Sequence, residues 1–141
     1  MKQGISLVFA LVSASVFAQS PVGLWKTIDD ATGKEKSSVR VSEAGGVVSG
    51  KIESIVDPAK QDSKCDECSD ERKGKPVIGM TILRNAKKGD GVWEGGDILD
   101  PNNGKVYRVR LTPSADNKKM QVHGYFGVAI FGRTQTWVRA E

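Results

Sequence analysis

The chain has 141 residues, a formal net charge of +4 and 27% charged residues. This length allows one domain with a substantial core and leaves little room for a second. The basic residues are scattered along the chain rather than gathered in a stripe with aromatic side chains, which argues against a nucleic-acid partner. Even the nearest cluster, Arg84, Lys87 and Lys88, is typical of a solvated turn.

Residues 1–18 have the pattern of a secretory signal peptide. Lys2 supplies a positive charge, Ile5 to Ala18 is a mostly apolar run, and the small Ala18 suits a cleavage site. A membrane anchor is the alternative interpretation. The apolar run is shorter than the roughly 20 residues that span a bilayer, so we expect no integral membrane protein. No cysteine follows Ala18, so we expect no lipid anchor. Residues 19–141 should form a single domain in the periplasm or outside the cell, where ATP- and NADPH-driven chemistry is largely excluded.

Short segments rich in β-branched and aromatic residues follow. The alternation is clearest where Val39 and Val41 share one face, and again at Tyr107, Val109 and Leu111. The expected strands are residues 22–28, 37–43, 47–56, 76–83, 92–99, 106–111, 120–126 and 134–139. Glycine, asparagine and aspartate fall between them, as hairpin turns require.

Strands joined mainly by short hairpins form a meander, and a meander of this size closes because open sheet edges invite aggregation. The sequence therefore predicts an all-β, antiparallel, up-and-down barrel of about eight strands. Within the fifth strand, Gly95 and Gly96 predict a bulge that lets Trp93 and Ile98 face the same side.

The stretch from Asp57 to Lys75 breaks this rhythm, because it is long, polar and contains both cysteines. In an oxidising compartment Cys65 and Cys68 predict a disulfide, which in so small a ring adds at most roughly 2 kcal/mol. Thiol exchange is an alternative, although the flanking carboxylates would raise the thiol pKa. Metal binding is a further alternative, but the chain has one histidine and no other cysteine, so we expect neither a metal nor a cofactor.

Two further patterns resemble catalytic motifs. Gly45 to Lys51 matches G-x-x-x-x-G-K, but Ile52 follows where a phosphate-binding loop needs Ser or Thr, and no helix is expected there, so we interpret it as a hairpin turn. His123 alternates outward in its strand, and the chain contains no G-x-S-x-G elbow. We therefore expect no catalytic residues and no enzyme.

Gly23-Leu24-Trp25 begins the first expected strand, and Arg139 ends the last one. If the barrel closes, these strands are neighbours, and Arg139 or Arg133 can lie over the Trp25 ring as a cation–π pair. A Gly-x-Trp in the first strand with a late arginine is similar to the pattern of the calycins, the lipocalin-like barrels. The alternative is that Trp25 only fills the core.

The chain also resembles a family of secreted bacterial proteins catalogued as a domain of unknown function. The resemblance rests on segments spread over most of residues 19–141: Gly23-Leu24-Trp25, Cys65 and Cys68, Pro76 to Met80 with Ile82-Leu83, Trp93 to Ile98, Asp100-Pro101, Gly104 to Tyr107, Gly124 to Gly127, and Phe131 to Trp137. It implies a secreted lipocalin-like barrel and supplies no catalytic or ligand residue.

The first functional hypothesis is a non-catalytic binding protein for a small apolar or amphipathic molecule. Its pocket is expected to be lined by inward residues, with an arginine at the mouth: Val41, Ile52, Trp93, Tyr107, Val109, Val122 and Phe126, with Arg108 or Arg110. The second hypothesis is a filled barrel that binds a cell-envelope protein through residues 57–75. The third is thiol–disulfide exchange through Cys65 and Cys68.

Overall fold

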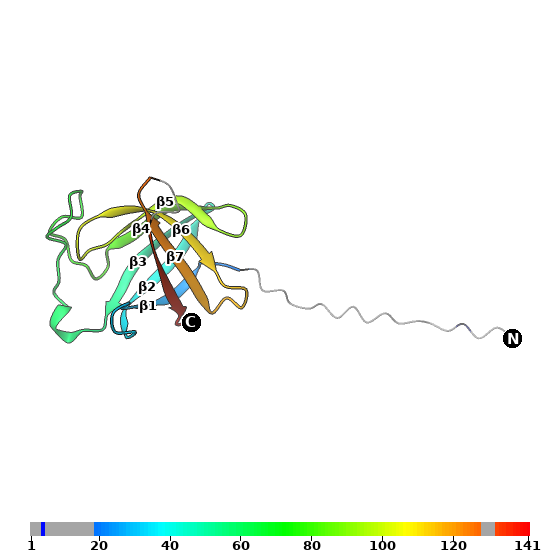
Figure 1. The fold of residues 1–141 in the computed structure, drawn as a ribbon, viewed down its shortest axis with the longest axis horizontal. Coiled ribbons are helices and arrows are strands. Elements are labelled where there is room, and N and C mark those ends of the chain that lie inside the picture. Colours follow the sequence, from blue (N-terminus) through cyan, green and yellow to red (C-terminus); the bar gives the residue numbers. More distant parts are fainter. Residues whose placement is uncertain (1–3, 5–18, 128–131) are drawn as a thin grey trace.

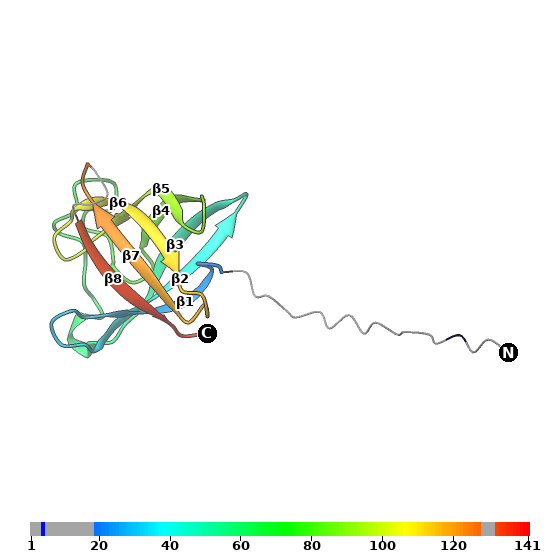
Figure 2. The same cartoon turned by 45° about the vertical axis from the view of Figure 1, so that its right-hand side comes forward.

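The computed structural model describes Gly4, residues 19–127 and residues 132–141, so the expected signal peptide lies outside the described residues apart from Gly4. The described residues form a closed antiparallel barrel in which each strand pairs with its neighbours in sequence (Figures 1 and 2). The strands are β1 (Gly23–Ile28), β2 (Glu35–Ala44), β3 (Val47–Ile55), β4 (Thr81–Lys88), β5 (Trp93–Leu99), β6 (Val106–Pro113), β7 (Lys119–Tyr125) and β8 (Gly132–Arg139), and a 3₁₀ turn, η1 (Pro58–Lys60), follows β3. The predicted all-β, up-and-down barrel is confirmed.

The two ends of the barrel differ in how their strands are joined. At one end the connections β2–β3, β4–β5 and β6–β7 are short; between β2 and β3, Gly45 and Gly46 take φ values of +59° and +80° that suit a tight hairpin. The other end carries the β1–β2, β3–β4, β5–β6 and β7–β8 connections, of which β3–β4 is by far the longest. In Figure 1 this long connection, residues 56–80, runs along the left side of the barrel.

Packed side chains fill the interior near the short hairpins. The fully buried members are mostly large and apolar: Trp25, Val39, Val41, Val48, Leu83, Leu111 and Met120. Trp25 also meets its polar requirement, because its Nε1 donates a hydrogen bond to the Pro21 carbonyl oxygen at 2.8 Å. This half of the barrel is a solid core.

The predicted bulge in β5 is confirmed. The register between β5 and β6 shifts between Glu94 and Gly96, and Gly95 has a φ of +83°. A Cβ at Gly96 would overlap the backbone of Arg84 and Asn85 on β4, so only glycine lets the strands approach this closely. Because of the bulge, Trp93 is buried and Ile98 also packs against the core.

The fourth strand was wrongly placed at residues 76–83. Val77 to Met80 belong to the long connection, where the Val77 amide donates to Ser63 O and Gly79 has a φ of +88°. The strand instead continues to Lys88 and buries Ala86 completely. The prediction followed the apolar residues in 76–83, whereas the true strand carries charged side chains that point to solvent.

The barrel has two seams that loosen toward the end with the long connection. β3 pairs with β4 from Val47 to Lys51, and beyond that the chain of residues 56–80 packs into the gap. β1 pairs with β8 through Trp25–Arg139 and Lys26–Val138 alone among the described residues. Both seams open on the same end of the barrel.

Candidate functional site

A cavity of about 890 Å³ occupies the half of the barrel that the core does not fill. Its depth is apolar, with Ile52, Ile55, Ile82, Ile98, Leu99 and Val122 in its wall. The filled barrel assumed in the second hypothesis is therefore corrected: the barrel is solid at one end and hollow at the other. The volume falls within the range of small-molecule sites, about 300–1,000 Å³.

Charged side chains of both signs surround the mouth of the cavity. They come from the β1–β2 hairpin and from the long connection: Asp29, Lys34, Glu35, Lys36, Asp57, Lys60, Lys64, Asp66 and Glu67. Neither sign dominates, so the electrostatic field at the mouth does not strongly favour either an anionic or a cationic ligand.

Aromatic side chains complete the rim. The rings of Tyr107 and Phe126 lie with centroids 4.6 Å apart, and both residues border the cavity. Phe126 is 58% exposed, so an apolar ring stands at the entrance. The Tyr107 hydroxyl accepts a hydrogen bond from Asn103 Nδ2 at 3.2 Å.

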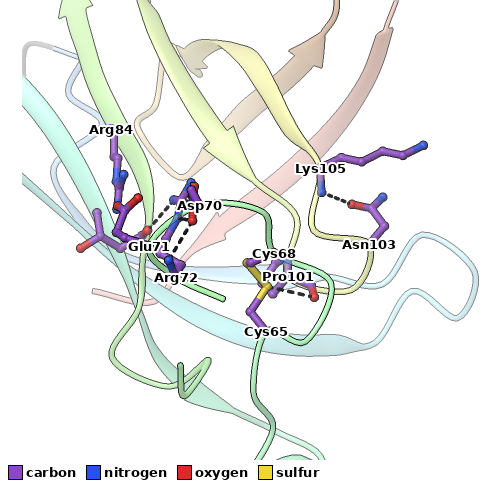
Figure 3. A network of polar contacts seen from close by, with 10 residues as sticks. Cys65, Cys68, Asp70, Glu71, Arg72, Arg84, Pro101, Asn103 and Lys105 are labelled. Atoms are coloured by element: carbon purple, nitrogen blue, oxygen red, sulfur yellow. Dashed lines mark hydrogen bonds and ion pairs between the residues drawn. A yellow bond between two sulfur atoms is a disulfide. The ribbon is translucent and has the colours of Figure 1, made fainter. Parts of the chain in front are cut away.

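The predicted disulfide between Cys65 and Cys68 is present and shapes the long connection. Both sulfur-bearing residues are buried, and the ring is braced by backbone hydrogen bonds from the Cys65 amide to Lys75 O and from the Gly74 amide to Cys65 O. Cys65 Sγ lies 3.8 Å from Pro101 O in the β5–β6 connection (Figure 3). The staple thus docks the long connection onto the β5–β6 connection at the mouth.

A second anchor ties the same connection to β4. Arg72 is 5% exposed; its Nη1 donates to Thr81 O at 2.9 Å and its Nη2 pairs with Asp70 Oδ2 at 2.5 Å. Hydrogen bonds from Arg72 lower the pKa of Asp70 to about 2. Next to it, Arg84 of β4 pairs with Glu71 at 2.5 Å (Figure 3), and hydrogen bonding to Arg84 lowers the pKa of Glu71.

At the β1–β8 seam an ion pair stands where strand pairing stops. Arg133 of β8 pairs with Asp30, which follows β1, and its Nε lies 3.0 Å from Asp30 Oδ2. The hydrogen bond from Arg133 lowers the pKa of Asp30. These contacts close the seam with side chains rather than backbone.

The other predicted arginine closes the barrel at its solid end. Arg139 Cζ lies 4.2 Å from the centroid of the Trp25 ring, which is the cation–π geometry expected for it. Gly23 leaves room for this contact, since a Cβ there would collide with Arg139 Nη1. Of the two arginines considered, Arg139 lies over Trp25 and Arg133 does not.

The residues predicted for the pocket divide into two groups. Four border the cavity: Ile52, Tyr107, Val122 and Phe126. Val41, Trp93 and Val109 face inward but lie in the packed half of the barrel, where they are at most 5% exposed. Arg108 points outward between two inward residues of β6 and is exposed, and Arg110 pairs with Glu94 outside the barrel, so neither reaches the mouth.

Several cavity residues were not predicted. They include Thr27, Ser37, Ile82, Ile98, Gln135 and Trp137. The period-two spacing of Arg133, Gln135 and Trp137 was a usable signal, because three residues at this spacing share one face of a strand.

Two motifs have structural roles here. Residues 45–51 form the β2–β3 turn and the start of β3, as predicted. His123 is partly exposed on β7, where Nδ1 lies 2.8 Å from Thr134 Oγ1 and the ring stacks on Tyr125.

The comparisons with known proteins agree with this geometry. A family model described as "Uncharacterized protein conserved in bacteria (DUF2147)" matches residues 23–139. The chain belongs to the DUF2147 family. A comparison with curated proteins gives no match. This DUF2147 chain is also similar in structure to a solved Helicobacter pylori protein, whose title assigns that protein to the lipocalin family.

That structure is 24% identical in sequence to this chain, with a TM-score of 0.75, and the match covers 88% of this chain and 85% of the other. The similarity shows the lipocalin-like fold and nothing about the ligand. Among the described residues of this DUF2147 protein, no helix is long and apolar enough to span a membrane. Within the same residues, no three His, Cys, Asp or Glu side chains are grouped to hold a metal ion.

Proposed function

We propose that this DUF2147 protein binds a small molecule with a large apolar surface inside its barrel and catalyses no reaction. The cavity of about 890 Å³ carries the proposal, because it combines an apolar depth with a polar mouth. A protein stabilised by its core alone would gain more from filling that space, since empty apolar volume costs stability.

The first test is native mass spectrometry of the protein purified without denaturation from its own compartment. A discrete added mass that is lost in organic solvent supports the proposal and gives the mass of the ligand. The second test is titration of the emptied protein with a fluorescent apolar probe such as N-phenyl-1-naphthylamine.

A matched pair of variants locates the binding site. Ile98→Trp adds a large ring within the cavity wall, whereas Val106→Trp adds the same ring at a position on β6 that is 37% exposed and does not border the cavity. We expect the first substitution to abolish probe binding and the second to preserve it. Equal binding by both folded variants would contradict an internal site.

We further propose that the protein acts in the periplasm or outside the cell. Support comes from the signal-peptide pattern of residues 1–18 and from the disulfide, which persists in oxidising compartments. Fractionation followed by N-terminal sequencing should find a chain that begins at Gln19. A full-length chain in the cytoplasm would contradict this proposal.

Binding of an envelope protein through residues 57–75 stays a prediction. These residues are docked by the disulfide and by Arg72, and several of them border the cavity mouth, so their described role favours shaping the entrance. Thiol exchange also stays a prediction, and the burial of both cysteines argues against it.

A further inference from the structure

The strands divide the cavity wall into two sides of different chemistry. From β3 to β7 the lining side chains are apolar or aromatic: Ile52, Ile55, Ile82, Ile98, Leu99 and Val122, with two tyrosines near the rim. From β8, β1 and β2 they are mostly polar, with Ile28 and the Trp137 ring as apolar exceptions: Thr27, Glu35, Lys36, Ser37, Arg133 and Gln135. Because β8, β1 and β2 are adjacent in the closed barrel, the polar residues lie on one side of the cavity and form a polar wall, with the Arg133–Asp30 pair bridging the open part of the β1–β8 seam.

This polar wall runs along the depth of the cavity and is not confined to its mouth. On β8 the side chain of Arg133 is 64% exposed, Gln135 is half-buried and Trp137 is 2% exposed, so the three descend from the entrance into the interior. On the neighbouring strands, Thr27 Oγ1 and Ser37 Oγ lie 2.6 Å apart beside the cavity. A ligand in the cavity therefore meets hydrogen-bonding groups along its length.

The wall has hydrogen-bonding capacity that the described residues do not use. The Thr27 and Ser37 oxygens each have two lone pairs, and their mutual hydrogen bond occupies one of these four. The remaining lone pairs accept hydrogen bonds, so the ligand groups that match them are hydroxyls that donate.

A linear acyl chain does not match this arrangement. Its polar atoms lie at one end, whereas the cavity presents Thr27, Ser37 and Gln135 along a side. Methylene groups packed against those side chains would displace the water that satisfies them and leave polar groups unpaired. A site built to hydrogen-bond a ligand discriminates strongly against analogues that lack the matching oxygens.

We infer that the cavity binds a facially amphipathic molecule, with hydroxyl or carbonyl oxygens along one long edge and hydrocarbon along the opposite edge. This inference rests on the proposed internal binding site and specifies its ligand class. The polar edge would lie on β8, β1 and β2, and the hydrocarbon edge on β3 to β7.

The test compares two rigid isomers, cholate and ursocholate, by isothermal titration calorimetry below their micelle concentrations. Cholate has its ring hydroxyls on one face, whereas ursocholate has one of them moved to the opposite face; the formula and the side-chain carboxylate are the same. We expect cholate to bind at least about ten-fold more tightly, which corresponds to the loss of one buried hydrogen bond.

Variants assign the preference to the polar wall. The double substitution Thr27→Val with Ser37→Ala removes both partners of one hydrogen bond with little change in shape, and Gln135→Leu removes the amide. Both variants should reduce the ratio of the two affinities toward one. The control Ile82→Val trims the apolar wall and should weaken both isomers by the same factor, leaving the ratio unchanged.

The outcomes separate the two proposals. Equal affinities for the isomers, or no binding of either while palmitate or N-phenyl-1-naphthylamine binds, would overturn the facial match and leave the binding function standing. Failure of every probe to bind the emptied protein would overturn the binding function itself.

Discussion

The guanidinium of Arg139 stacks on the indole ring of Trp25, with Cζ 4.2 Å from the ring centroid. The same guanidinium donates hydrogen bonds to the carbonyl oxygens of Ser20, Val22 and Asn117 at 2.6–2.8 Å. Trp25 and Arg139 also face each other in the β1–β8 pairing. One side chain thus joins the segment before β1, the β6–β7 turn and the last strand at the solid end of the barrel.

Replacing this guanidinium should destabilise the fold without affecting the cavity. We expect Arg139→Lys to lower the free energy of unfolding by about 2 kcal/mol, because an ammonium cannot stack and donate to several carbonyls in one geometry. Denaturant unfolding measures this loss. The control is Arg40→Lys at an exposed ion pair with Glu53, which should change stability little. Similar losses in both variants would mean that barrel closure does not depend on Arg139.

The docking of the long connection should depend on Gly104. This residue has a φ of +71°, and a Cβ on it would overlap the Glu67 carbonyl in the disulfide ring. Gly104→Ala should therefore lower the free energy of unfolding by about 2–4 kcal/mol, from backbone strain plus steric overlap. It should also expose residues 57–75 to proteolysis.

Gly91→Ala is a matched control for that substitution. Gly91 has a nearly identical φ of +70°, but an added Cβ there would meet nothing within 4 Å. Its loss should reflect backbone strain alone, about 1–2 kcal/mol. If the two alanine variants lose the same stability and resist protease equally, the contact of Gly104 with Glu67 does not hold the connection in place.

Much of the barrel could be predicted from the sequence because strands half-buried in a barrel alternate in polarity. Val39 and Val41 face inward as that alternation predicts, and the glycine-rich turns separate the strands correctly. The pairing of Trp25 with Arg139 could be predicted because an up-and-down barrel makes its first and last strands neighbours. These features depend on local patterns and on one topological rule.

The position of the cavity could not be predicted in the same way. Alternation identifies the inward face but not the depth along the barrel axis, so Val41, Trp93 and Val109 share a face with Ile52 and Val122 yet lie in the packed half. The polar wall was missed for a different reason. Inward positions were expected to be apolar, and Gln135 and Thr27 break that rule because they border a hollow rather than a core.

The disulfide should stabilise the shape of the mouth more than the fold. The ring that it closes is small, so replacing both cysteines, Cys65→Ser with Cys68→Ser, should cost at most about 2 kcal/mol in unfolding free energy. Hydrogen exchange at the Cys65 and Gly74 amides of the native protein should be slow, because Cys65 donates to Lys75 O and Gly74 donates to Cys65 O; the serine variant should lose that protection. Unchanged protection in the variant would assign the loop shape to Arg72 and Gly104 alone.

Asp70 should make the attachment of this connection to β4 sensitive to acid. Hydrogen bonds from Arg72 lower its pKa from 3.8 to about 2, so between these values the unfolded chain binds more protons than the folded one. The stabilisation is therefore complete above about pH 5 and declines as the pH falls toward about 2.

The measurement is the difference in unfolding free energy between the wild type and Asp70→Asn across that interval. We expect the difference to be constant above about pH 5 and to shrink in acid, because a protonated Asp70 no longer compensates the buried charge of Arg72. The control Glu71→Gln removes the exposed pair with Arg84 and should leave most of this pH dependence in place. A difference that stays flat down to about pH 2 would contradict a stabilising Asp70–Arg72 pair.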